Sequence, residues 1–287
     1  MRESVGSMGW AAGGVLLLAV ALRLYGLSGE MPPDSLVYAQ YAWNLADGSF
    51  RLATDSWYAH RFPVFIPAAP LYSWFGVGVL TTSAWPLVLS LGQIVLAMVV
   101  GWRFFGKPAG LLGGLLLAIY PLDVIEAGRM LPDMVMGGLV GWAGALWFLT
   151  TRDRSSVRGW ALLVAGICLA LAVVVRPYAL LLLAYLGADT WIRRVPGRSL
   201  LWVLAGMAAV AIPLLAIYQL ETGDLLYRVR VISNTYSSGI LAEDPQWLYY
   251  ISHIWSPKRF TGLFPLLLLG SALFVLLRPD RVRVSLL

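Results

Sequence analysis

Eight apolar runs follow one another along the chain, separated by shorter polar stretches. A membrane-spanning helix needs about 20 predominantly apolar residues, with a range of roughly 17–25. The runs that approach this length lie at about residues 9–27, 84–102, 109–121, 134–150, 159–175, 177–192, 199–219 and 261–277. Because the third run is short, seven or eight of them would cross a bilayer. We therefore expect an all-α, polytopic membrane helical bundle of about eight transmembrane helices.

The composition indicates the same class of protein. Hydrophobic residues make up 59% of the 287 residues and charged residues only 13%, against about a quarter in a typical soluble domain. The single cysteine, Cys168, lies within a predicted span, which excludes an intrachain disulfide. We expect one membrane-embedded module over residues 1–287.

The basic residues are unevenly divided between the two predicted membrane faces. With the N-terminus in the cytoplasm, twelve basic residues fall on that side, in short loops with few acids. The other nine are spread over longer loops that hold eleven acids. The positive-inside rule therefore predicts that both termini are cytoplasmic. The net charge of +6 is explained by this topology, and nothing in the pattern indicates a nucleic-acid partner.

The polar complexity of the chain lies in the predicted outer loops, at about 28–83, 122–133 and 220–260. In the first loop, residues 35–48 carry apolar side chains at helical spacing and end at a glycine, which predicts an amphipathic helix on the membrane surface. Residues 63–76 are rich in proline and aromatic side chains. They predict an irregular entry followed by a second juxtamembrane helix.

Two aspartates at the outer face are candidates for chemistry. Asp34 and Asp133 each follow a proline and precede an apolar helix. A partly shielded carboxylate can accept a proton from an attacking group or bind a divalent metal. The alternative for both is helix N-capping, in which the carboxylate accepts backbone N–H bonds.

Several basic side chains lie near the same predicted face and could bind an anion. Arginine is suited to phosphate because its guanidinium donates two parallel hydrogen bonds. The alternative for Arg23 and Arg176 is that the side chain extends to the lipid headgroups. His60 is a weaker candidate, since a loop histidine is more often an ordinary surface residue. The candidate cations are Arg23, His60, Arg61, Arg129 and Arg176.

Five segments in order give the chain a resemblance to a known family. It resembles the membrane glycosyltransferases of the GT-C superfamily, which include protein O-mannosyltransferases and the aminoarabinose transferases of lipid A. The segments are ALRLYGLSGEMPPDSLVYAQYAWNLADG, HRFPVFIPAAPLYSWFG, AGRMLPDMVMGGLVGWAGALWF, LVAGICLALAVVVRPYALLLL and ETGDLLYRV.

The resemblance implies transfer of a sugar from a polyprenyl-phosphate donor to a lipid, glycan or protein acceptor. The enzyme would lie in the plasma (inner) membrane, with its active site on the extracytoplasmic side. Asp34 would be the catalytic base or a carboxylate bound to a divalent metal, and Asp133 the second acidic residue. Ser35 stands where many relatives have another acid, which disfavours a paired-carboxylate metal site. The side chains expected to bind substrate are Tyr38, Tyr58, His60, Arg61, Arg129 and Arg176.

Two other classes of function remain open. A lipid or solute transporter, or flippase, would also explain many spans and external arginines, but it should carry ionisable residues near the membrane centre. A non-catalytic membrane subunit of a glycan-assembly complex would explain the short chain.

Overall fold

The structure, a computed structural model, describes residues 3–27, 29, 32–152 and 158–237. The chain divides into two units, Met1–Tyr227 and Arg228–Leu287. Every regular element within the described residues is helical, which confirms the expected all-α class. The second unit is described only at residues 228–237, which belong to α12 (Tyr227–Ser237). All the other described helices belong to the first unit.

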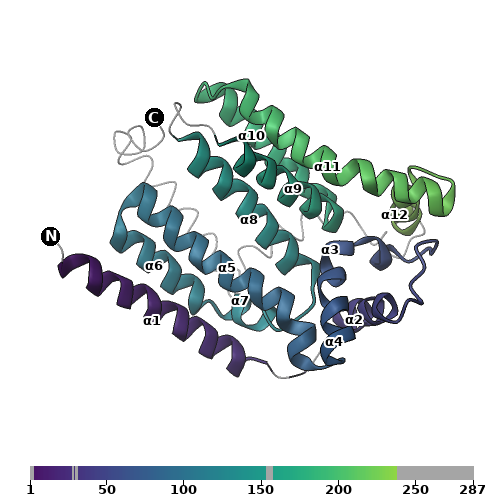
Figure 1. Ribbon diagram of the computed structural model, residues 1–287, viewed down its shortest axis with the longest axis horizontal. Coiled ribbons are helices and arrows are strands. Elements are labelled where there is room, and N and C mark those ends of the chain that lie inside the picture. Colours follow the sequence, from purple (N-terminus) through teal and green to yellow (C-terminus); the bar gives the residue numbers. More distant parts are fainter. Residues whose placement is uncertain (1–2, 28, 30–31, 153–157, 238–287) are drawn as a thin grey trace. The chain divides into compact units, whose positions relative to one another are not determined.

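The longer helices pack side by side in an order that differs from their order in the chain (Figure 1). α1 packs on α6, α6 on α5, α5 on α8, α8 on α9, and α9 on α11. α10 lies against α9 and α11. These helices are α1 (Glu3–Tyr25), α5 (Val79–Phe105), α6 (Lys107–Ala118), α8 (Pro132–Thr151), α9 (Gly159–Val175), α10 (Leu180–Ile192) and α11 (Gly197–Thr222).

Three of these helices, α5, α8 and α11, are long and apolar enough to cross a membrane by length and composition. Four shorter apolar helices lie at Gly9–Tyr25, Lys107–Ala118, Gly159–Val175 and Pro177–Ile192. Together they coincide with seven of the eight apolar runs. The eighth run, at 261–277, lies outside the described residues.

Short helices gather at the end of the bundle where α5 and α8 begin and α9 ends (Figure 1). Trp85 of α5 fastens this region by donating from Nε1 to the carbonyl of Pro63 at 2.9 Å. The short elements are α2 (Pro33–Ala46), η1 (Trp57–His60), α3 (Phe62–Phe65), η2 (Ile66–Ala68), α4 (Ala69–Phe75), α7 (Pro121–Glu126) and η3 (Pro177–Ala179).

Both helices expected in the first outer loop are present. α2 buries Ser35, Tyr38 and Ala42 on one face, and the chain then turns at Gly48, whose φ is +76°. This left-handed conformation costs glycine little because glycine has no Cβ. The proline-rich segment folds as three short helical pieces ending at Gly76. The amphipathic pattern therefore predicted α2 correctly.

α9 and α11 approach each other most closely at two glycines, Gly166 of α9 and Gly206 of α11. A Cβ on Gly166 would collide with the carbonyl of Val203, and one on Gly206 with the carbonyl of Leu163. Small residues at a crossing allow backbones to approach closely, which is a common way to stabilise helix pairs within lipid.

A buried polar cluster ties α1 to α5, α6 and α7. Arg23, only 1% exposed, pairs with Asp123 of α7, and its Nε donates to Ser90 Oγ of α5 at 2.6 Å. Its Nη1 donates to the carbonyl of Ala118 at 3.0 Å, and Ser90 Oγ donates to Asp123 at 2.6 Å. The interpretation of Arg23 as a side chain extended to the headgroups is therefore wrong. A buried ion pair persists only when its remaining donors and acceptors are satisfied, as they are here.

Candidate active site

Asp34 lies in the first turn of α2, half-buried, at the end of the bundle where the short helices gather. The N-cap position belongs to Pro32, and no side chain caps this helix. Asp34 Oδ1 instead accepts a hydrogen bond from Tyr58 Oη at 2.9 Å. The capping alternative for Asp34 is wrong, and its carboxylate is engaged across the loop.

Tyr58 is well placed to orient that carboxylate. It lies in η1, and its ring meets Tyr38 edge-on at 5.4 Å between centroids. Burial, together with the neighbouring Asp34 carboxylate, raises the pKa of the Tyr58 phenol. The phenol therefore stays protonated at neutral pH and acts as a donor to Asp34.

Arg61 is a buried cation beside Asp34 and Tyr58. It is 6% exposed, donates from Nη1 to Tyr38 Oη at 2.8 Å and stacks on Trp57 at 3.9 Å from the ring centroid. Among the described residues, no carboxylate forms an ion pair with it. Burial of a charge without a counter-ion is costly, so such a guanidinium is a natural receptor for an anion.

Tyr38 complements Arg61 as a neutral donor. Burial raises the pKa of Tyr38 to about 12, although the adjacent guanidinium opposes the shift. The phenol oxygen accepts the bond from Arg61, which leaves its hydroxyl hydrogen available for another acceptor. Arg61 and the fully buried Tyr38 are thus joined by one hydrogen bond between α2 and the residue that follows η1.

Asp133, in the first turn of α8, and Arg176, the C-cap residue of α9, form an ion pair. Arg176 Nη2 lies 2.9 Å from Asp133 Oδ2, and the Asp133 side chain is 65% exposed. Leu131 is the N-cap of α8, and no side-chain cap is made, so the capping alternative is wrong for Asp133 too. Arg176 Nε is buried and has no hydrogen-bond partner among the described residues. It keeps one unsatisfied donor.

The two acidic residues are brought to the same region by the loop before α8. Ser35, the neighbour of Asp34, is fully buried and donates to the carbonyl of Met130 at 3.3 Å. The charges of Arg61, Arg176 and Asp133 all influence the pKa of Tyr178. These three side chains therefore lie around the Tyr178 hydroxyl. The sequence-predicted residues Asp34, Asp133, Arg61 and Arg176 thus share one end of the bundle.

His60 and Arg129, both expected to bind substrate, are engaged with protein partners. His60 is fully buried, with Nε2 3.1 Å from the carbonyl of Thr54 and Nδ1 3.0 Å from Tyr218 Oη. It fastens η1 to α11. Arg129 pairs with Glu126 at 3.2 Å. Burial raises the pKa of Glu126, and the charge of Arg129 opposes this.

Sequence reasoning missed three contributors: Trp57, Glu126 and Tyr178. The spacing of Glu126 and Arg129, three residues apart in a helix-like turn, was a readable signal for their pair. The roles of Trp57 and Tyr178 depend on contacts between distant segments.

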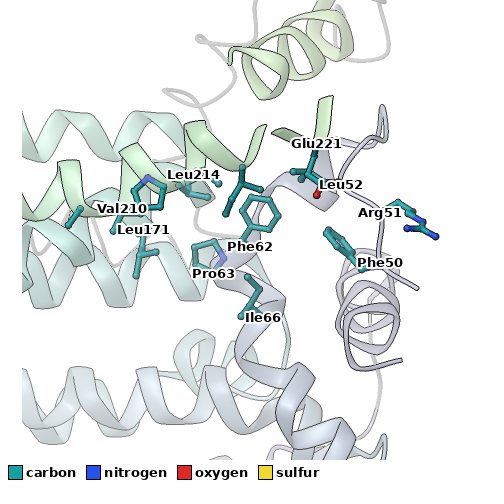
Figure 2. Close-up of a pocket in the computed structure, with 14 residues that line it drawn as sticks. Phe50, Arg51, Leu52, Phe62, Pro63, Ile66, Leu171, Val210, Leu214 and Glu221 are labelled. Carbon is teal, nitrogen blue, oxygen red and sulfur yellow. The ribbon is translucent and has the colours of Figure 1, made fainter. Parts of the chain in front are cut away.

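An elongated apolar pocket of about 530 Å³ opens beside this region (Figure 2). Side chains of α9 and α11 face those of residues 50–66 across it, and Arg51 and Glu221 lie toward one end. Phe62 is adjacent to Arg61 in the chain, and Val174 lies two residues before Arg176. The walls are Phe50, Arg51, Leu52, Phe62, Pro63, Ile66, Leu171, Val174, Ala209, Val210, Pro213, Leu214, Ile217 and Glu221.

The residues around Asp34 do not assemble a protein-built metal site. Within the described part of the chain, no three His, Cys, Asp or Glu side chains gather closely enough to hold a metal ion. Asp34 offers one carboxylate, half engaged by Tyr58, and Ser35 is turned into the core. Divalent metal binding at Asp34 stays a prediction from the family resemblance.

Comparison of the chain with known proteins finds no family model, no curated protein and no solved structure that matches it.

Proposed function

We propose that this chain is a membrane glycosyltransferase that moves a sugar from a polyprenyl-phosphate donor to a lipid, glycan or protein acceptor. One observation carries the proposal. Arg61, a buried guanidinium that no carboxylate of the described residues pairs with, lies in one cluster with Asp34, a half-buried carboxylate that does not cap its helix. An anion receptor next to a base is what transfer from a phosphate leaving group requires.

The proposed topology has about eight spans, with both termini in the cytoplasm. Asp34, Tyr38, Tyr58 and Arg61, called here the Asp34 cluster, would lie on the extracytoplasmic face of the plasma membrane. The three long apolar helices and the concentration of polar side chains at the end of the bundle that holds α2 support it. A site at this level would let a donor keep its lipid tail in the bilayer.

The donor would be held at two points. Its phosphate would accept hydrogen bonds from Arg61 and from the Tyr38 hydroxyl, with the unsatisfied Nε of Arg176 as a further donor. Its isoprenoid chain would occupy the apolar pocket of about 530 Å³ beside Phe62. Pockets for lipid-like ligands are mostly apolar, with a few polar groups that fix orientation.

In the transfer step, an acceptor hydroxyl would attack the anomeric carbon of the sugar. A bond forms between the acceptor oxygen and that carbon, while the bond from the carbon to the phosphate oxygen breaks. The phosphate keeps the electron pair, and the acceptor proton passes to Asp34 Oδ2, which the bond from Tyr58 to Oδ1 leaves open. Arg61 and Tyr38 would stabilise the charge that develops on the phosphate.

The test is Asp34→Asn in the purified full chain, reconstituted with radiolabelled polyprenyl-phosphate hexoses and pentoses. A general base contributes about 10²–10⁴-fold to rate, so transfer should fall by at least 100-fold. Asp47→Asn is the matched control, because Asp47 is an exposed acid at the other end of α2. Full transfer by a well-folded Asp34→Asn protein would overturn the catalytic assignment.

The transporter alternative is favoured by one specific observation. Arg23 and Asp123 form a buried ion pair joined by Ser90, although the pair lies at the last turn of α1 and not at the middle of a span, where a transporter should carry such residues. The cluster is, however, saturated with hydrogen bonds, which is typical of a structural tie. Lipid or solute movement in the same vesicles, without any sugar transfer by the wild type, would favour the transporter. Transfer that needs an added partner would favour a subunit.

A further inference from the structure

The end of the bundle opposite Asp34 contains a second cavity. It has a volume of about 370 Å³ and lies where α5 and α8 end and α9 begins. The other ends of α8 and α9 carry Asp133 and Arg176 of the candidate site. The lining is Arg103, Leu146, Leu149, Thr150, Arg158, Trp160 and Ala161.

The walls of this cavity combine cationic and apolar groups. Arg103 lies in the last turn of α5, and Arg158 is the N-cap residue of α9, a helix start without a side-chain cap. Leu146, Leu149 and Ala161 supply an apolar wall, and the indole of Trp160 is 66% exposed. The guanidinium groups match the phosphate of a phospholipid headgroup, and the aliphatic wall matches an acyl chain.

Neighbouring charges at this end help to identify which cations belong to the cavity. Arg193 is paired with Asp189, which also accepts a bond from Trp147 Nε1 at 2.7 Å. Arg152 lies over Phe104 and donates to the carbonyl of Arg103 at 2.6 Å. Neither Arg193 nor Arg152 lines the cavity, and the cations that line it among the described residues are Arg103 and Arg158.

We propose that this cavity binds an anionic phospholipid, with its headgroup phosphate at Arg103 and Arg158 and an acyl chain along Leu146 and Leu149. α5 and α8 are long enough to cross a bilayer, so their ends lie at headgroup depth, where tryptophan is also enriched. Basic pockets between transmembrane helices are known to bind anionic headgroups. The proposal does not depend on glycosyl transfer.

The experiment is native mass spectrometry of the full chain in detergent, titrated with phosphatidylglycerol or with phosphatidylcholine of the same acyl chains. The wild type should bind phosphatidylglycerol at least tenfold more tightly. Arg158→Gln and Arg103→Gln should each reduce this preference by about tenfold. Arg198→Gln is the matched control, since Arg198 is an exposed arginine in the first turn of α11 and does not line the cavity.

Three outcomes would overturn the proposal. Equal binding of the two lipids would remove the charge selectivity, and equal losses for Arg158→Gln and Arg198→Gln would show that general charge is responsible. Displacement of the lipid by inorganic phosphate at similar concentration would show that the cavity takes free phosphate. Circular dichroism of each variant checks that the helices remain folded, and these exposed arginines should be tolerated.

Discussion

Asp34 and its neighbour Ser35 make different contacts at the start of α2. Tyr58 engages one of its oxygens, and the adjacent Ser35 is buried against the carbonyl of Met130. A second acid in place of Ser35 would face an acceptor in the core and find no donor there, which would be costly. The serine at this position is therefore explained by its packing.

Tyr58→Phe removes the hydroxyl that orients Asp34 and leaves the ring in place. We expect kcat to fall by about tenfold with little change in KM, because only the positioning of the base is lost. Tyr41→Phe is the control: Tyr41 lies in the same helix as Asp34, and its ring packs on Phe65. Steady-state kinetics measure both, and equal effects of the two variants would contradict the role of Tyr58.

Arg61→Gln should weaken donor binding without lowering the thermal stability of the protein. The substitution removes a buried charge that has no carboxylate partner among the described residues, so the thermal midpoint should stay the same or rise. Donor binding should weaken by at least tenfold, because the phosphate loses a charged donor. Calorimetry and equilibrium binding of a polyprenyl phosphate test the two halves. A large fall in the midpoint would mean that Arg61 is mainly structural.

At the scale of elements, the segment before α8 is held at three points by three different helices. Asp123 is bound by α1 and α5, the carbonyl of Gly128 accepts a bond from Ser83 of α5 at 2.7 Å, and α2 reaches Met130. Asp133 comes immediately after this segment. Its position is thus fixed by the bundle, although its side chain is exposed.

The crossing of α9 and α11 gives a sharp test of element packing. Gly166→Ala introduces a methyl group into the backbone of α11, so we expect a loss of roughly 1–3 kcal/mol in unfolding free energy. Gly144→Ala should instead be neutral or stabilising, because nothing lies near that position and alanine favours helix by about 1 kcal/mol. Unfolding in mixed detergent micelles measures both, and similar losses would argue against the close crossing.

The elements were more predictable than the contacts between them. Apolar run length located the described apolar helices, and helical spacing located α2, because both signals are local. The partner of Arg23 could not be found in this way, since Asp123 lies 100 residues away and belongs to a segment assigned to an outer loop. Likewise, the bond between Tyr58 and Asp34 depends on how η1 folds back on α2.

At the scale of the whole first unit, polar groups gather at the two ends of an apolar bundle. One end carries the Asp34 cluster, and the other carries Arg103, Arg158 and the pair of Asp189 with Arg193. The outer helix α11 exposes apolar side chains such as Ile212 at 66%. This distribution is what a bilayer demands, since a helix exposed to lipid must be apolar between its ends.

The alkaline stability of the molecule should depend on Tyr38. Its pKa is about 12 in the folded chain, against 10.0 without the fold. Because the folded state holds this proton more tightly, its contribution is intact below pH 10 and is lost progressively as the pH rises toward 12. Tyr38→Phe should lack that part of the decline, which amounts to about 1.4 kcal/mol at about pH 11, one unit above the unperturbed pKa. Unfolding at about pH 9 and about pH 11, on either side of the unperturbed tyrosine pKa, compares the two proteins.

The buried pair of Arg23 and Asp123 has a consequence for the identity of the first helix. In the proposed topology α1 crosses the membrane, and another apolar helix with the same flanking charges could do so equally well. Only one with a guanidinium at the right height would satisfy Asp123, Ser90 and the carbonyl of Ala118 together. If α1 is an anchor as proposed, a foreign anchor grafted in its place would insert into the membrane but would not pack correctly on α5, α6 and α7. In the proposed topology, membrane insertion and correct packing are therefore separate requirements for α1.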